Sequence, residues 1–177
     1  MRTHSMTFPG LAVAASAVLA LAGCATPAGP AATAVLQATT GNQASGTVRF
    51  VQRGSVVRVS GEVRGLKPNA EHGFHVHEKG DCTSGDGMSA GGHFNPDGRP
   101  HGRPGTGTHH VGDLPSLKAD ARGVAKVDFE SAALRIREGA ANIVGRGLIV
   151  HRDPDDYTSQ PAGNAGPRLA CAVITNA

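Results

Sequence analysis

Residues 55–64, Ser-Val-Val-Arg-Val-Ser-Gly-Glu-Val-Arg, carry the clearest fold signal in the chain, because small or apolar residues alternate with polar ones. The residues that share one face are Val57, Val59, Gly61 and Val63. Successive side chains of a β-strand point to opposite faces, so this period of two predicts a strand with one buried side.

Eight further segments resemble strands, and no segment shows a convincing helical period. They are residues 35–38, 46–52, 73–77, 115–119, 124–130, 132–137, 142–150 and 169–174, with a hairpin turn at Arg53-Gly54. We therefore expect an all-β fold: an eight-stranded antiparallel Greek-key β-sandwich or barrel. Two long stretches, 78–114 and 152–168, show no period, and long loops of this kind usually carry function.

The composition supports a single loop-rich domain. The 177 residues include 25 Gly and 11 Pro, and only 3% are aromatic. The hydrophobic share of 39% is too high for a disordered chain. The net charge of +3 is small and no dense Lys/Arg run occurs, so we expect no nucleic-acid partner.

The N-terminal segment resembles a bacterial lipoprotein signal. Arg2 precedes an apolar run over residues 11–22, which ends in Leu21-Ala22-Gly23-Cys24. We expect residues 1–23 to be a signal peptide and Cys24 to receive the lipid, although an ordinary secretory segment with an incidental cysteine is the alternative. The small, Pro-rich residues 24–33 then form a flexible tether, and residues 34–177 form the domain.

Two cysteines remain besides Cys24. Both a lipoprotein signal and an ordinary secretory segment direct the chain out of the cytosol. In the oxidising compartment outside it, Cys82 and Cys171 most simply form a disulfide. Two buried free thiols are the alternative.

Histidines are concentrated in one part of the chain. Seven of the eight histidines that follow the leader lie between His72 and His110, and Asp113 comes three residues later. His75 and His77 occupy positions i and i+2 of an expected strand, so their imidazoles lie on the same face. Imidazoles with one carboxylate suit copper, zinc or nickel better than calcium or magnesium.

Six blocks of the sequence together resemble copper/zinc superoxide dismutase in order and spacing, from about Ala34 to the C-terminus. They are Gly73-Phe74-His75-Val76-His77, Gly91-Gly92-His93-Phe94-Asn95-Pro96, His101-Gly102, His110-Val111-Gly112-Asp113-Leu114, Val150-His151 and Gly163-Asn164-Ala165-Gly166-Pro167-Arg168-Leu169-Ala170-Cys171. With the leader, the chain resembles a bacterial lipoprotein-type member.

The resemblance implies one copper and one zinc ion. The implied copper ligands are His75, His77, His93 and His151. The implied zinc ligands are His93, His101, His110 and Asp113. His93 then bridges both metals through its two ring nitrogens. His109 adjoins His110, and the family pattern His-Val-Gly-Asp favours His110 as the ligand, so whether His109 assists zinc stays open.

The resemblance also implies roles beyond the metal ligands. Asp155 is expected to link a copper-ligand histidine to a zinc-ligand histidine by hydrogen bonds. His72 is expected to bond to the backbone, and Arg168 to lie beside the copper channel, where a guanidinium can dock a small anion. We expect Tyr157 to pack or to pin a loop.

The implied reaction converts two superoxide anions and two protons to dioxygen and hydrogen peroxide, with Arg168 and His93 as the catalytic residues. A non-catalytic copper- and zinc-binding envelope lipoprotein is the alternative. We expect the domain to be lipid-anchored through Cys24 in the bacterial cell envelope, on the periplasmic or surface side, and to protect the envelope from superoxide. Cys82 follows His77 by only five residues, as in bacterial members, so both a monomer and a homodimer remain open.

Overall fold

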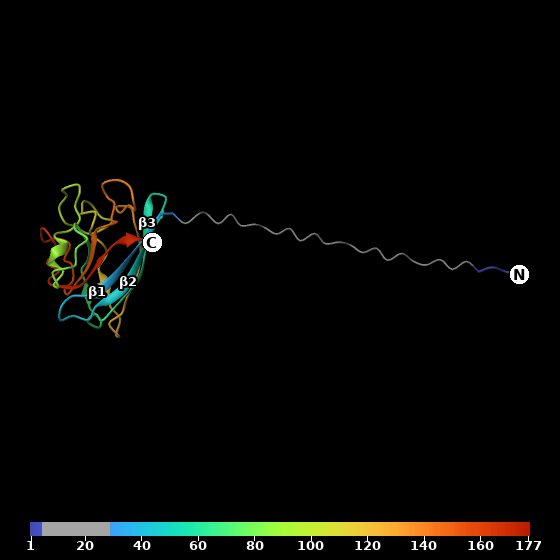
Figure 1. Cartoon of the computed structure of the whole chain (residues 1–177), viewed down its shortest axis with the longest axis horizontal. Helices are drawn as coiled ribbons and strands as arrows, with labels where there is room; N and C mark the ends of the chain where they lie inside the picture. Colours follow the sequence, from blue (N-terminus) through green and yellow to red (C-terminus); the bar gives the residue numbers. More distant parts are fainter. Residues whose placement is uncertain (5–28) are drawn as a thin grey trace.

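Strand β1 (Ala31–Ala38) joins the two halves of an eight-stranded antiparallel sheet that curls into a half-barrel (Figure 1). The computed structural model describes residues 1–4 and 29–177. Residues 31–36 of β1 pair with β2, whereas Gln37 and Ala38 pair with β9. One strand therefore belongs to both halves, and this closes the curl.

The remaining strands follow in the sheet order β5-β8-β9-β1-β2-β3-β7, with β10 also paired to β1. Their bounds are β2 (Ser45–Arg53), β3 (Val56–Arg64), β5 (Phe74–His77), β7 (Ala125–Ser131), β8 (Gly147–His151), β9 (Arg168–Val173) and β10 (Thr175–Asn176). Two short strands, β4 (Glu71–His72) and β6 (Leu117–Lys118), form a second sheet, and the 3-10 helix η1 spans Met88–Ala90.

The expected eight-stranded antiparallel fold with two long loops is confirmed. The chain crosses between the halves from β3 to β5, from β5 to β7 and from β7 to β8, because β5 and β8 pair at one edge and β3 and β7 at the other. The longest connections are residues 78–116 and 152–167.

Several expected boundaries are wrong. Residues 132–137 form no strand, and the segment expected at 142–150 is a strand only from Gly147. The side chain of Asn142 accepts the N–H groups of Arg137 and Val144, so the backbone between them folds on itself. Leu134 and Ile136 lie in this irregular segment and are both buried. Their spacing of two residues resembles the alternation of a strand.

The tether prediction is also too long. β1 begins at Ala31, three residues inside the expected tether, because Ala32 and Thr33 pair with β2 on one side and with β10 on the other. The hairpin turn lies one residue later than expected, at Gly54-Ser55, with Arg53 paired to Val56.

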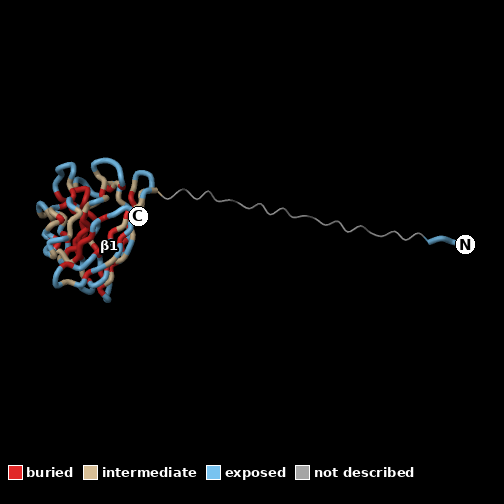
Figure 2. The backbone as a smooth tube through the Cα atoms, in the orientation of Figure 1, coloured by how far each residue is buried: buried red, intermediate tan, exposed pale blue. Residues whose placement is uncertain are grey.

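The core lies inside the curl, where buried backbone from both halves meets (Figure 2). Val57, Val59 and Val63 are fully buried, as the alternation along residues 55–64 predicts. The leader expected at 1–23 and the lipidation site Cys24 fall almost entirely outside the described residues. In the described part of the chain, no helix has the length and hydropathy needed to cross a membrane.

Candidate metal centre

The edge strand β5 carries the first two candidate ligands. His75 and His77 point to the same side of the strand, and both are buried. Bridges pair His77 with His93 and His75 with Asp113 along the edge that β8 leaves open. Residues 78–116 therefore fold back over this edge and bring two further ligands to β5.

A three-way set of backbone hydrogen bonds fixes this arrangement. The N–H of Val76 donates to Gly112 O, that of Gly112 to Phe94 O, and that of Phe94 to Val76 O, each at 2.8 Å. A Cβ on Gly112 would collide with the Val76 carbonyl oxygen, so only glycine permits the close approach.

Four imidazoles form the first group. His75, His77, His93 and His151 each offer a ring nitrogen, and these atoms all lie within 4.8 Å of one another. The Nε2 atoms of His77 and His151 are 3.4 Å apart. Nδ1 of His75 and Nε2 of His93 are buried and have no hydrogen-bond partner among the described residues. Buried polar atoms normally have partners, so these two nitrogens fit a metal ion that they would bind.

Outer hydrogen bonds select the ring nitrogen that each histidine offers. His77 Nδ1 donates to Gly91 O at 2.9 Å and His151 Nδ1 donates to Gly166 O at 3.0 Å. A carbonyl only accepts, so the opposite nitrogen, Nε2, carries the lone pair that a metal needs.

The second group combines three imidazoles with one carboxylate: His93, His101, His110 and Asp113. Asp113 Oδ1 lies 2.9 Å from His93 Nδ1, 3.0 Å from His101 Nδ1 and 3.3 Å from His110 Nδ1. Such nitrogen and oxygen donors in a four-ligand set are typical of zinc.

His93 belongs to both groups. Its Nδ1 faces Asp113, whereas its unpartnered Nε2 belongs to the four-histidine side. The ring centroids of His93 and His75 are 4.0 Å apart. The two groups are therefore joined through a single imidazole.

Asp155 makes a second connection between the groups. Its Oδ2 accepts from His75 Nε2 at 2.7 Å and its Oδ1 accepts from His101 Nε2 at 2.9 Å, and all three side chains are inaccessible to solvent. Gly163 packs against this link, and a Cβ there would collide with Asp155 Oδ1 and lie 2.6 Å from His101 Nε2.

Burial and the neighbouring carboxylates shift the pKa values of the histidines in opposite directions. Burial lowers the pKa of His75 to about 4 and that of His151 to about 3, and it holds the pKa of His77 well below its ordinary value. Burial also opposes charge on His101, but hydrogen bonds to Asp113 and Asp155 outweigh it and raise the pKa of His101 to about 9. The low pKa values of His75, His77 and His151 favour their neutral form, which is the form that binds a cation.

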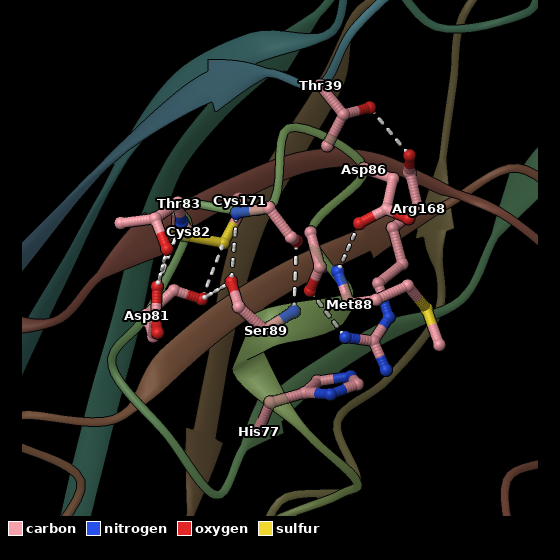
Figure 3. The surroundings of a disulfide bond; sticks show 12 residues. Thr39, His77, Asp81, Cys82, Thr83, Asp86, Met88, Ser89, Arg168 and Cys171 are labelled. Atoms are coloured by element: carbon pink, nitrogen blue, oxygen red, sulfur yellow. Dashed lines mark hydrogen bonds between the residues drawn. A yellow bond between two sulfur atoms is a disulfide. The ribbon is translucent and has the colours of Figure 1, made fainter.

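Arg168 lies beside the four-histidine group. Its guanidinium donates to Gly87 O at 2.5 Å and to Gly91 O at 2.6 Å, and Figure 3 shows it extending toward the ring of His77. Partial burial lowers the pKa of Arg168 below its ordinary value, but the group stays charged at neutral pH. A fixed positive charge thus borders the group.

The expected disulfide between Cys82 and Cys171 is present and ties residues 78–116 to β9 (Figure 3). Ser89 supports the same loop by donating to Asp81 O at 2.9 Å. The disulfide and this hydrogen bond hold the segment whose Gly87 and Gly91 carbonyls position Arg168.

The structure brings all the candidate ligands together and places the remaining histidines outside both groups. His72 Nδ1 donates to the backbone oxygen of His151 at 2.9 Å. His109 Nδ1 donates to the backbone oxygen of His110, and His110 faces Asp113. Sequence reasoning missed Gln160, which bonds to the backbone of His101 from 59 residues away and has no local signal.

Comparisons with known proteins agree with this geometry. A sequence model of the family described as "Copper/zinc superoxide dismutase (SODC)" matches residues 44–174. The chain is 50% identical over 135 residues to "Superoxide dismutase [Cu-Zn]" of Paramecium bursaria Chlorella virus 1, covering 73% of this chain and 71% of the relative. It is 44% identical over 151 residues to the protein of the same name from Saccharomyces cerevisiae, covering 81% and 96%.

A solved structure gives the same result for the fold. The crystal structure of the clock protein EA4 superimposes with a TM-score of 0.75 at 39% sequence identity, covering 82% of this chain and 93% of that one. The fold, the two histidine-rich groups and the matched family agree. The chain belongs to the copper/zinc superoxide dismutase family and is an oxidoreductase with one copper and one zinc site.

Proposed function

We propose that the four-histidine group holds copper and that the group containing Asp113 holds zinc. The observation that carries this assignment is the position of His93, whose two ring nitrogens face the two groups. Imidazoles suit copper as well as zinc, and a carboxylate oxygen with three imidazole nitrogens is a four-ligand set of the kind that zinc takes.

The reaction is the dismutation of superoxide: two superoxide anions and two protons give dioxygen and hydrogen peroxide. When bound, copper supplies the one-electron chemistry and zinc supplies a fixed charge without redox chemistry. The protein's own groups bind the anion, deliver a proton and keep the ligands in place.

Arg168 is the anion-docking residue in this proposal. Two of its N–H groups are used by the carbonyls of Gly87 and Gly91, which fix the plane of the guanidinium. Its other N–H groups have no acceptor among residues 29–177, so they are available to a small anion. The positive charge also raises the local concentration of anions.

His93 is the proton carrier in this proposal. Its Nε2 is buried and unpartnered among the described residues, while its Nδ1 is held by Asp113. The ring can therefore hold a proton on Nε2 while Nδ1 stays on the zinc side, and this N–H can donate its proton to a superoxide anion beside the four-histidine group.

Anomalous diffraction on crystals of metal-loaded protein tests the assignment. Data collected on both sides of the copper and zinc absorption edges should give a copper peak among His75, His77, His93 and His151 and a zinc peak beside Asp113. Copper signal beside Asp113 with zinc among the four histidines would overturn it.

We further propose that the protein is a lipoprotein-type member of its family, anchored through Cys24 in the bacterial cell envelope, where it removes superoxide. The sequence Leu21-Ala22-Gly23-Cys24 after an apolar run supports this, as does the short distance in sequence between Cys24 and the start of β1 at Ala31. Detergent phase partition of cell extracts tests it. The wild-type protein should enter the detergent phase, and Cys24→Ser should move it to the aqueous phase with its activity retained; an aqueous wild-type protein would contradict the anchor.

A further inference from the structure

Residues 152–167, the loop that carries Asp155, also contact the segment with the proposed zinc ligands through Gln160 and Tyr157. Gln160 and Tyr157 lie in this loop, and neither belongs to a metal group. We propose that Gln160 and Tyr157 are positioning residues that hold His101 against Asp155 before zinc binds, so that the zinc ligands are assembled in the metal-free protein. This inference rests on the zinc ligand set proposed above.

Gln160 holds the backbone of His101 from both sides. Its Oε1 accepts the His101 N–H at 2.9 Å and its Nε2 donates to His101 O at 3.0 Å. Asp155 meanwhile holds the imidazole of the same residue at 2.9 Å. One loop therefore fixes both the main chain and the ring of His101.

Tyr157 holds Asp155, which in turn holds the imidazole of His101. The Tyr157 N–H donates to Asp155 Oδ1 at 2.7 Å, and its hydroxyl accepts from the Ser116 N–H and donates to Ser116 Oγ, each at 2.9 Å. Arg103, two residues after His101, lies over the ring with its Cζ 4.1 Å from the centroid. Tyr157 thus joins Asp155 to two points of the loop that carries the zinc ligands.

The segment around His101, residues 97–108, contains no regular secondary structure. Residues 103–108 contain no strand or helix, and five of the six are exposed. His101 lies two residues before this stretch, and on its other side the exposed residues 97–100 also lack a strand or helix. Without Gln160, the backbone of His101 loses both of the hydrogen bonds it makes to another loop.

Residues that orient metal ligands from outside typically change metal affinity by about 10- to 100-fold when they are removed. We therefore expect Gln160→Ala in the full chain to weaken Zn²⁺ binding by this factor in chelator competition. We also expect it to change the visible spectrum of Co²⁺ bound in place of zinc, because the geometry at His101 relaxes. Tyr157→Phe, which keeps the ring under Arg103, should have a smaller effect than Tyr157→Leu.

Gln52→Ala is the matched control. Its side-chain amide also bonds to backbone, donating to Gly54 O at 2.8 Å and accepting from the Ile136 N–H at 3.1 Å, but at the β2–β3 hairpin. It should lower stability and leave zinc affinity and the Co²⁺ spectrum unchanged. Equal weakening of zinc by Gln52→Ala and Gln160→Ala would overturn the proposal, because it would reduce the effect to general stability.

Amide exchange in metal-free protein tests the order of assembly directly. By NMR, the His101 amide should be protected from exchange in the wild type and lose that protection in Gln160→Ala; an unprotected amide in the wild type would contradict the inference. Asp113→Ala distinguishes a failure of the proposed zinc ligand set from a failure of the positioning role. If it leaves zinc affinity unchanged, the proposed ligand set fails, whereas loss of zinc in Asp113→Ala with wild-type affinity in Gln160→Ala rejects the positioning role alone.

Discussion

Arg168 and His77 donate hydrogen bonds to the same carbonyl oxygen, that of Gly91, at 2.6 and 2.9 Å. This shared acceptor sets the position of the charge relative to the ligand ring, and it leaves Nε2 of His77 with a lone pair for copper. The anion-docking group and a metal ligand are therefore held as one unit. A change in the loop around Gly91 should affect both.

Arg168→Ala should slow superoxide turnover by roughly tenfold or more with both metals retained, because it removes the positive charge that attracts and docks the anion. Turnover of the wild type should fall with rising ionic strength, and this dependence should flatten in Arg168→Ala and reverse in Arg168→Glu. Stopped-flow superoxide decay over a salt series measures it. Arg122→Ala, which removes an exposed arginine paired with Asp120, is the control and should behave as the wild type. Unchanged rates in both Arg168 variants at full copper occupancy would remove this residue from the mechanism.

Gly163→Ala should disrupt the contact between Asp155 and His101, because the added Cβ meets both side chains. Gly105→Ala is the matched control: φ is +64° at Gly163 and +77° at Gly105, but nothing lies within 4 Å of a Cβ at Gly105. Both variants carry the cost of a left-handed backbone, roughly 1–2 kcal/mol. Only Gly163→Ala should also lose zinc on dialysis, measured as metal content per chain, and equal zinc retention in the two variants would contradict this.

Replacing both Cys82 and Cys171 with Ser should lower the free energy of unfolding by about 2–5 kcal/mol, because the disulfide closes a long loop and restricts the unfolded chain. The hydrogen bonds that hold the Arg168 side chain should also weaken in this variant, because the released segment carries their acceptors, the Gly87 and Gly91 carbonyls. Chemical denaturation measures the first effect, and amide exchange of residues 83–92 measures the second. A wild-type free energy of unfolding in the variant would show that the disulfide does not stabilise the protein.

His77→Ala and His151→Ala should lose copper and activity while retaining zinc, because each belongs only to the four-histidine group. Asp113→Ala should lose zinc and stability but keep residual dismutation. Metal content by mass spectrometry, with activity measured on the same samples, distinguishes these outcomes. Parallel loss of both metals from all three variants would reject the separation of the two sites.

Alternation along the strands and the aperiodic stretches between them predict the fold class and the two long loops, because these are local signals. The ligand positions follow from the resemblance of six sequence blocks to the family. The sequence does not predict the irregular path of residues 132–146, where Asn142 replaces a strand ladder with side-chain hydrogen bonds. The sequence also does not predict the roles of Gln160 and the Gly91 carbonyl. Their partners lie 59 and 77 residues away, so only the folded loops show that they meet.

Superoxide decay at fixed zinc and increasing copper is the most direct measurement of the proposed chemistry. The rate constant per chain should rise in proportion to copper up to one equivalent, and zinc-only protein should consume superoxide no faster than buffer. Rapid decay in zinc-only protein, or no decay at full copper occupancy of the four-histidine group, would contradict the assignment of copper to His75, His77, His93 and His151.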